Sequence, residues 1–101
     1  MAKKYLADFV NLTINDKEAA YAKIDDYYKS QKLQTYTDFE NALKNIYSTK
    51  FLSAKVVSYT VVDKTNYKLF YIIDGDNNTF IFKEKSIMNY TVYLDSYTIE
   101  K

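Results

Sequence analysis

Few side chains in this sequence could carry out catalysis, because its 101 residues include no histidine and no cysteine. Histidine is the usual general base near neutral pH and the cysteine thiolate is the strongest side-chain nucleophile, so two common catalytic routes are excluded. Carboxylates remain, and the adjacent pair Asp25–Asp26 could supply a general acid and base. Neighbouring residues on a helix diverge by about 100°, so at most one of the two could face a pocket. We predict a solvated helix face here and no catalytic residue.

The segment Asp74–Asn78, reading DGDNN, has oxygen ligands of the kind that bind calcium. An EF-hand loop that began at Asp74 would need glycine and glutamate at positions now held by Thr79 and Lys85. The segment also holds the only glycine of the chain, and a tight hairpin turn uses glycine for a positive φ. We therefore predict a turn here, no metal site and no cofactor.

Tyrosine is unusually abundant, with 12 residues. It joins a large apolar ring to a polar hydroxyl, which suits a binding surface or a pocket lined with hydroxyl groups. Alternatively, tyrosine replaces phenylalanine and histidine in the product of an AT-rich genome and fills the edge of the core. The codon preference behind this composition suggests a Gram-positive bacterium of low GC content or its phage. The predicted binding residues are Tyr59, Tyr71, Tyr90, Tyr93 and Asp95.

The charge pattern argues against a nucleic-acid partner. The net charge is only +1, and all 14 basic residues are lysines. Bidentate recognition of guanine and phosphate relies mainly on arginine, which is absent. No 18 apolar residues run together, and the start MAKKYLADFVN lacks an apolar signal region. The chain as written is expected in the cytoplasm; it would be extracytoplasmic and near a membrane only if an N-terminal anchor had been removed.

The first half of the chain is predicted to form helices, one of which carries Asp25–Asp26. An amphipathic period predicts a first helix that ends at Asn15, with Asp16 capping a second helix. The second helix carries an apolar stripe from Ala20 to Gln31. The segment Thr37–Glu40 has the form of a capping box and predicts the start of a third helix.

From Phe51 the apolar period changes to two, which predicts strands. The predicted strands are Phe51–Val62, Tyr67–Ile73, Thr79–Lys85 and Ile87–Ile99. In the last of them, one face would carry Met88, Tyr90, Val92 and Leu94, and the other Asn89, Thr91, Tyr93 and Asp95. We expect a single α+β domain over residues 1–101, with three N-terminal helices (about 2–48) packed on a curved, four-stranded antiparallel meander sheet (about 51–99).

Several motifs together resemble nuclear transport factor 2-like domains of the cystatin-like α+β superfamily. They are Ala19–Tyr21, Tyr27–Tyr28, Tyr36–Phe39 and the segment Met88–Thr98, reading MNYTVYLDSYT. The resemblance is closer to small domains of Gram-positive, often membrane-anchored proteins of unassigned function. It implies a cone-shaped pocket, and isomerases of related fold make Asp95 a possible carboxylate base. The superfamily also includes small-molecule binders and assembly modules, so the fold does not decide the function.

The expected function is that of a non-enzymatic protein-interaction or accessory module. The alternative is a small-ligand binder or a carboxylate-dependent isomerase that uses the cone-shaped pocket. A protein partner or a second copy is expected to bind at an edge of the sheet. The edge formed by Ile87–Ile99 carries little charge and has no proline. We therefore expect Tyr93, on the outer face, to belong to the interface.

Overall fold

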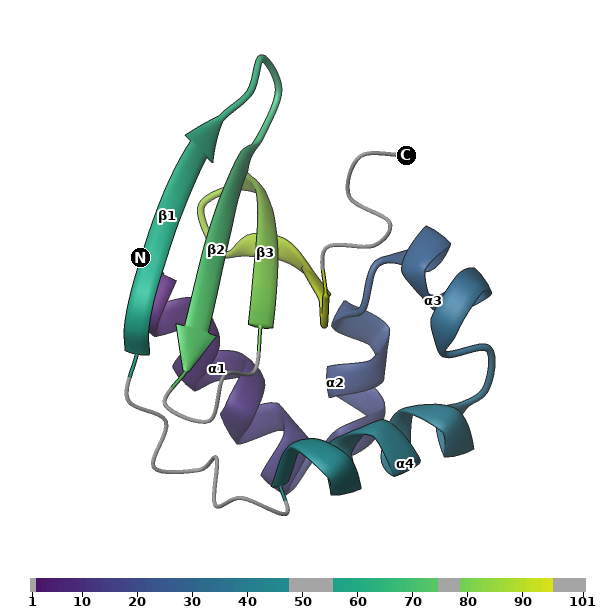
Figure 1. Cartoon of the computed structure of the whole chain (residues 1–101). Coiled ribbons are helices and arrows are strands. Elements are labelled where there is room, and N and C mark those ends of the chain that lie inside the picture. Colours follow the sequence, from purple (N-terminus) through teal and green to yellow (C-terminus); the bar gives the residue numbers. More distant parts are fainter. Residues whose placement is uncertain (1, 48–55, 75–78, 96–101) are drawn as a thin grey trace.

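The computed structural model describes residues 2–47, 56–74 and 79–95, which form four helices followed by four strands (Figure 1). The helices are α1 (Ala2–Asn15), α2 (Lys17–Lys23), α3 (Asp26–Lys32) and α4 (Tyr36–Tyr47). The strands are β1 (Val56–Asp63), β2 (Lys68–Asp74), β3 (Thr79–Ser86) and β4 (Asn89–Tyr93). The strands lie in the order β1-β2-β3-β4, and every neighbouring pair is antiparallel. The expected α+β class, with helices preceding a meander sheet, is confirmed.

The predicted second helix is two helices, because the chain leaves the helical conformation at Ile24. This residue is extended, with φ −66° and ψ 137°, and it forms a parallel bridge with Val92 of β4. The backbone N–H of Asp25 donates to the carbonyl of Val92 at 3.0 Å. The Asp25 carboxylate then accepts from the N–H of Tyr28 at 3.1 Å and so caps α3. The bonds to the sheet edge and the new cap compensate for the interrupted helix.

The other two helix starts show how local capping signals act. Asp16 caps α2 as predicted, since its carboxylate accepts from the N–H of Ala19 at 3.1 Å. The capping box before α4 lies two residues earlier than predicted. The hydroxyl of Thr35 accepts from the N–H of Asp38 at 3.1 Å, and the carboxylate of Asp38 accepts from the N–H of Thr35 at 3.2 Å.

The last strand is shorter than the predicted Ile87–Ile99. Ile87 and Met88 form the turn between β3 and β4, and Met88 has a positive φ of 65°. The hydroxyl of Tyr5 accepts from the N–H of Met88 at 3.0 Å and supports this left-handed turn, which a non-glycine residue rarely adopts. Pairing with β3 ends at Tyr93. The segments 48–55, 75–78 and 96–101 lie outside the described residues. The predicted turn after Asp74, the start of the predicted strand Phe51–Val62 and residues 96–99 of the last predicted strand therefore stay predictions.

The core lies mainly between one face of the sheet and helices α1 and α2 (Figure 1), and it also includes Tyr28 of α3, Phe39 of α4 and, on the other sheet face, Tyr93. Tyr5 and Phe9 of α1 are fully buried, and their rings pack on the rings of the central strands. Phe9 contacts Phe80 and Phe82 at centroid distances of 6.5 and 6.4 Å, while Tyr5 lies 5.7 Å from Phe70. These edge-on contacts between aromatic rings fix the position of α1 on the sheet.

Candidate interaction surface

Two of the predicted binding residues belong to the core. Tyr90 is 3% exposed and lies on the helix-covered face of β4, with its ring 4.7 Å from that of Tyr5. Tyr93 points to the opposite face, as the alternation predicts, but it is only 6% exposed. The prediction that Tyr93 lies outside the core is therefore wrong. The reason is α3, whose Tyr28 packs perpendicular to the Tyr93 ring at 6.1 Å.

Buried tyrosines fasten the helices to the sheet through carboxylates at the rim of the core. Tyr90 donates its hydroxyl hydrogen to Asp8 of α1, and Tyr5 of α1 donates to Glu84 of β3. Tyr28 of α3 donates to Asp95, just after β4, at 3.1 Å. Each pair joins residues more than 60 positions apart in the sequence, between a helix and the sheet. Much of the tyrosine content therefore serves the architecture.

These environments keep the tyrosine hydroxyls protonated. Burial is the main cause that raises the pKa of Tyr28, Tyr90 and Tyr93 above the ordinary value of 10.0. A hydrogen-bonded carboxylate adds to the rise: Asp95 for Tyr28, Asp8 for Tyr90 and, for Tyr93, Asp25. A negative charge at the hydroxyl would be both desolvated and repelled in each of these places. Acting as hydrogen-bond donors, these tyrosines hold the fold together.

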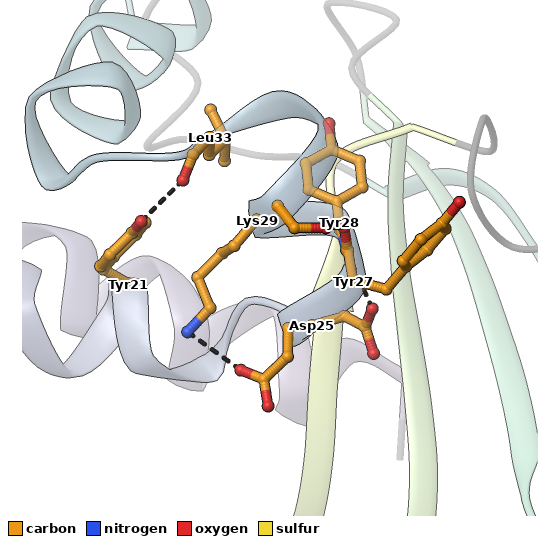
Figure 2. Close-up of polar contacts among 8 residues, drawn as sticks. Tyr21, Asp25, Tyr27, Tyr28, Lys29 and Leu33 are labelled. Atoms are coloured by element: carbon orange, nitrogen blue, oxygen red, sulfur yellow. Dashed lines mark hydrogen bonds and ion pairs between the residues drawn. The ribbon is translucent and has the colours of Figure 1, made fainter.

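Asp25 and Asp26, two of the candidate carboxylates, lie at the start of α3 (Figure 2). Asp26 is fully exposed and forms an ion pair with Lys29 at 3.3 Å, as expected for a solvated helix face. Asp25, its neighbour, is instead half-buried and holds the N–H of Tyr28. Asp95 accepts from Tyr28 and lies 3.6 Å from the ammonium of Lys32. Its side chain is 42% exposed, so it does not face the enclosed apolar wall that a carboxylate base of raised pKa requires.

The remaining predicted residues lie on different faces of the sheet. Tyr71 of β2 is half-buried, and Ile81 pairs with it across the strands on the face opposite α1. Tyr59 of β1 is 56% exposed and pairs with Ile72 on the helix-covered face. The structure thus does not bring the five predicted residues into one site, and Tyr59 is the one with the largest exposed fraction among those whose exposure is described.

Around Tyr59, the apolar rows of the core continue beyond the helices that cover them. One row runs across the strands through Val61, Phe70, Phe82 and Val92, and a parallel row runs through Tyr59, Ile72 and Phe80. The members on β2, β3 and β4 are 0–6% exposed. On β1 the exposed fraction rises to 41% for Val61 and 56% for Tyr59. The rows therefore end as an exposed apolar pair at the edge of the sheet.

The two edge strands of the sheet differ in whether another backbone segment pairs with them. The edge of β4 is occupied at Val92 by the extended segment Ile24–Asp25 between α2 and α3. Along the outer edge of β1, no described residue forms a backbone ladder. We call Tyr59, Val61 and the outward backbone groups of β1 the β1 edge surface. Sequence reasoning missed Val61, although its place in the uncharged run VVSYTVV could have indicated it.

Two polar pockets among the described residues include none of the predicted binding residues in their lining. One of about 190 Å³ lies beside β4 and includes Asp25, Lys83 and Thr91 in its lining. The other, of about 290 Å³, is a shallow hollow at the turn between β1 and β2. Within residues 2–47, 56–74 and 79–95, no three potential ligand side chains gather to hold a metal ion. The helices in those ranges are also too short or too polar to cross a membrane.

Comparison with protein-family models, with curated proteins and with solved structures finds no match to this chain. The resemblance to nuclear transport factor 2-like domains accordingly stays a prediction.

Proposed function

We propose that this domain is a non-enzymatic interaction module that associates with a second copy of itself through the β1 edge surface. The observation that carries the proposal is the exposure of Tyr59 and Val61 at the end of two otherwise buried apolar rows. These side chains lie along a strand whose outer backbone groups have no partner strand among the described residues. An added strand would satisfy those groups and cover the apolar pair in one step.

The second copy is favoured because the regular part of β1 is self-complementary. Its ladder with β2 is irregular between Val56 and Ser58 and regular from Ser58 to Asp63. An antiparallel pair of β1 strands related by a two-fold axis at Thr60 would place Tyr59 opposite Val61 of the second copy, and Thr60 opposite Thr60. Aromatic with β-branched residues and threonine with threonine are favourable cross-strand pairs. No charged side chains would oppose each other in this register.

The same two-fold symmetry would also bring together the exposed apolar side chains of the two copies. A two-fold axis normal to the sheet keeps the helices of both copies on the same face. Tyr59 and Val61 lie on that face, so the two copies would form one apolar cluster of four side chains between the two helical layers. Covering the exposed part of each side chain contributes roughly 1 kcal/mol. The contact is smaller than a standard interface of about 1,600 Å², so we expect a dimer with a dissociation constant of roughly micromolar or weaker.

The broader role that we propose is an accessory domain in a Gram-positive bacterium or its phage, related to nuclear transport factor 2-like domains. Support for the origin comes from the composition, and support for the kinship comes from the motifs Ala19–Tyr21 and Met88–Thr98. The order of elements, helices before an antiparallel sheet, agrees with that kinship. The alternative of a carboxylate-dependent isomerase has less support, because Asp95 is held by Tyr28 and Lys32.

Light scattering after size exclusion, over a range of protein concentrations, tests the proposal. The informative variant is Tyr59→Lys, since a charge at a strand edge discourages pairing. Its matched control is Tyr27→Lys on α3, because Tyr27 is 48% exposed and lies on a different element. We expect the wild type and Tyr27→Lys to dimerise with rising concentration and Tyr59→Lys to stay monomeric. A wild type that is monomeric at millimolar concentration would falsify the proposal, as would a Tyr59→Lys protein that dimerises normally.

A further inference from the structure

The pocket of about 190 Å³ beside β4 combines opposite charges with a hydroxyl that has no hydrogen-bond partner in the described part of the chain. One wall is the junction of α2 and α3, and the other is formed by β3 and β4. The helix side contributes Ala22, Ile24, Asp25 and Asp26, and the strand side contributes Lys83, Lys85 and Thr91. This pocket is separate from the β1 edge surface, with β2 between them in the sheet.

Thr91 is the residue that points to a ligand. Its Oγ1 atom is buried and has no hydrogen-bond partner among the described residues, and Thr91 is one of the residues that line the pocket between the two charged walls. Buried polar atoms are nearly always paired, so an unpaired one requires an explanation. A ligand oxygen that accepts from this hydroxyl would supply the missing bond.

The lysines on the strand side are available for an anionic group. Lys83 lies beside Thr91, because the two residues are cross-strand partners. Its ammonium lies 4.5 Å above the ring of Tyr67, and neither Lys83 nor Lys85 forms an ion pair with a described residue. Two ammonium groups and a hydroxyl donor form a suitable set for a carboxylate.

The helix side of the pocket selects against a simple anion. Asp25 and Asp26 carry two carboxylates, so the lining has no net charge and a lone anion would be attracted on one side and repelled on the other. A molecule with a carboxylate at one end and an ammonium at the other would meet opposite charges at both ends. The pocket would hold about six waters, and a ligand of comparable size has roughly six to nine non-hydrogen atoms.

We infer that this pocket binds a small zwitterion of the α-amino acid class. Its carboxylate lies against Lys83, Lys85 and the hydroxyl of Thr91, and its ammonium lies toward Asp25 and Asp26. The affinity is modest, with a dissociation constant near 1 mM, because so few atoms make contact and the pocket is open to solvent.

Titration of the isotope-labelled protein, followed by NMR of its backbone amides, tests this assignment. The probes are L-alanine, which carries both charges, and acetate and methylammonium, which each carry one. We expect L-alanine to give saturable shifts at Ile24, Lys85 and Thr91, and each single-charge probe to bind at least tenfold more weakly. Equal shifts with acetate alone would reveal an adventitious anion site and overturn the assignment, as would the absence of saturable shifts.

Two variants separate ligand binding from a structural role. Thr91→Val removes the hydroxyl, and Lys85→Gln removes one ammonium from an exposed side chain. Each is expected to weaken L-alanine binding about tenfold, the effect of losing one charge-assisted hydrogen bond. The matched control is Lys44→Gln, an exposed lysine on α4, which should bind L-alanine as the wild type does. Unchanged binding by Thr91→Val or by Lys85→Gln would contradict the placement of the carboxylate.

Discussion

Truncation of Tyr93 is expected to destabilise the fold strongly, even though the sequence pattern places this residue on the outer face of the last strand. Its side chain is 6% exposed, packs on Tyr28 and shares a hydrogen bond with Asp25. Truncating a buried aromatic residue to alanine costs about 3–5 kcal/mol. A domain of this size has a total unfolding free energy of roughly 5–15 kcal/mol, so Tyr93→Ala removes a large fraction of it.

Three variants divide this cost into its parts. Tyr93→Phe keeps the ring and loses the hydroxyl, so its expected cost is only about 1–2 kcal/mol, the loss of one partly buried hydrogen bond to a carboxylate. Tyr59→Ala makes the same truncation as Tyr93→Ala on an exposed strand position and should cost less than about 1 kcal/mol. Urea unfolding at low protein concentration, followed by circular dichroism, measures all three. If Tyr93→Ala costs no more than Tyr59→Ala, then α3 does not cover β4 as described.

Three further predictions follow from the same contacts. Above pH 10 the fold should lose stability steeply, because the unfolded chain releases tyrosine protons there while raised pKa values let Tyr28, Tyr90 and Tyr93 retain theirs in the folded chain. The part of the tyrosinate absorbance that comes from these three residues should therefore rise together with the loss of circular dichroism. A chain that ionises all its tyrosines while folded would disprove this. Asp25→Ala should lower the unfolding free energy by about 1–3 kcal/mol, because it removes the cap of α3 and the hydrogen-bond partner of Tyr93. Asp26 is fully exposed, so Asp26→Ala should unfold like the wild type. Similar denaturation midpoints for the two variants would contradict the role of Asp25 as the cap. Thr91→Val should raise the unfolding free energy by about 1 kcal/mol, because it removes a buried hydroxyl that no described residue pairs with; a loss of stability would show that the hydroxyl has a partner.

Local sequence patterns predicted most of the fold correctly because the signals that set it are local. The cap at Asp16 and the change of period near residue 50 determine where helices begin and where strands take over. The division of the second helix was not predictable in the same way. The apolar stripe continues through Ile24, and the break is stabilised by bonds to Val92, a residue 68 positions away in the chain.

The candidate site was harder to predict than the fold. Alternation along β4 correctly separates Val92 from Tyr93, but it cannot show that α3 covers the second face as well. For the same reason, alternation along the strands could not show that Ile24–Asp25 pairs with the edge of β4 while no described residue pairs along the outer edge of β1. Tyr59 was found from its residue type and its strand, whereas Val61 becomes a candidate only when the uncovered end of its row is visible.

Disulfide cross-linking is the measurement that tests self-association through the β1 edge surface most directly, since the wild-type chain has no cysteine. In the proposed register, Thr60→Cys places the two cysteines opposite each other, with Cα atoms about 4.5–5.5 Å apart, within the range that a disulfide spans. Tyr27→Cys on the exposed surface of α3 is the control. Mild oxidation is expected to convert Thr60→Cys rapidly to a covalent dimer and to leave Tyr27→Cys largely monomeric. Cross-linking of Thr60→Cys no faster than that of Tyr27→Cys would contradict self-association through the β1 edge surface.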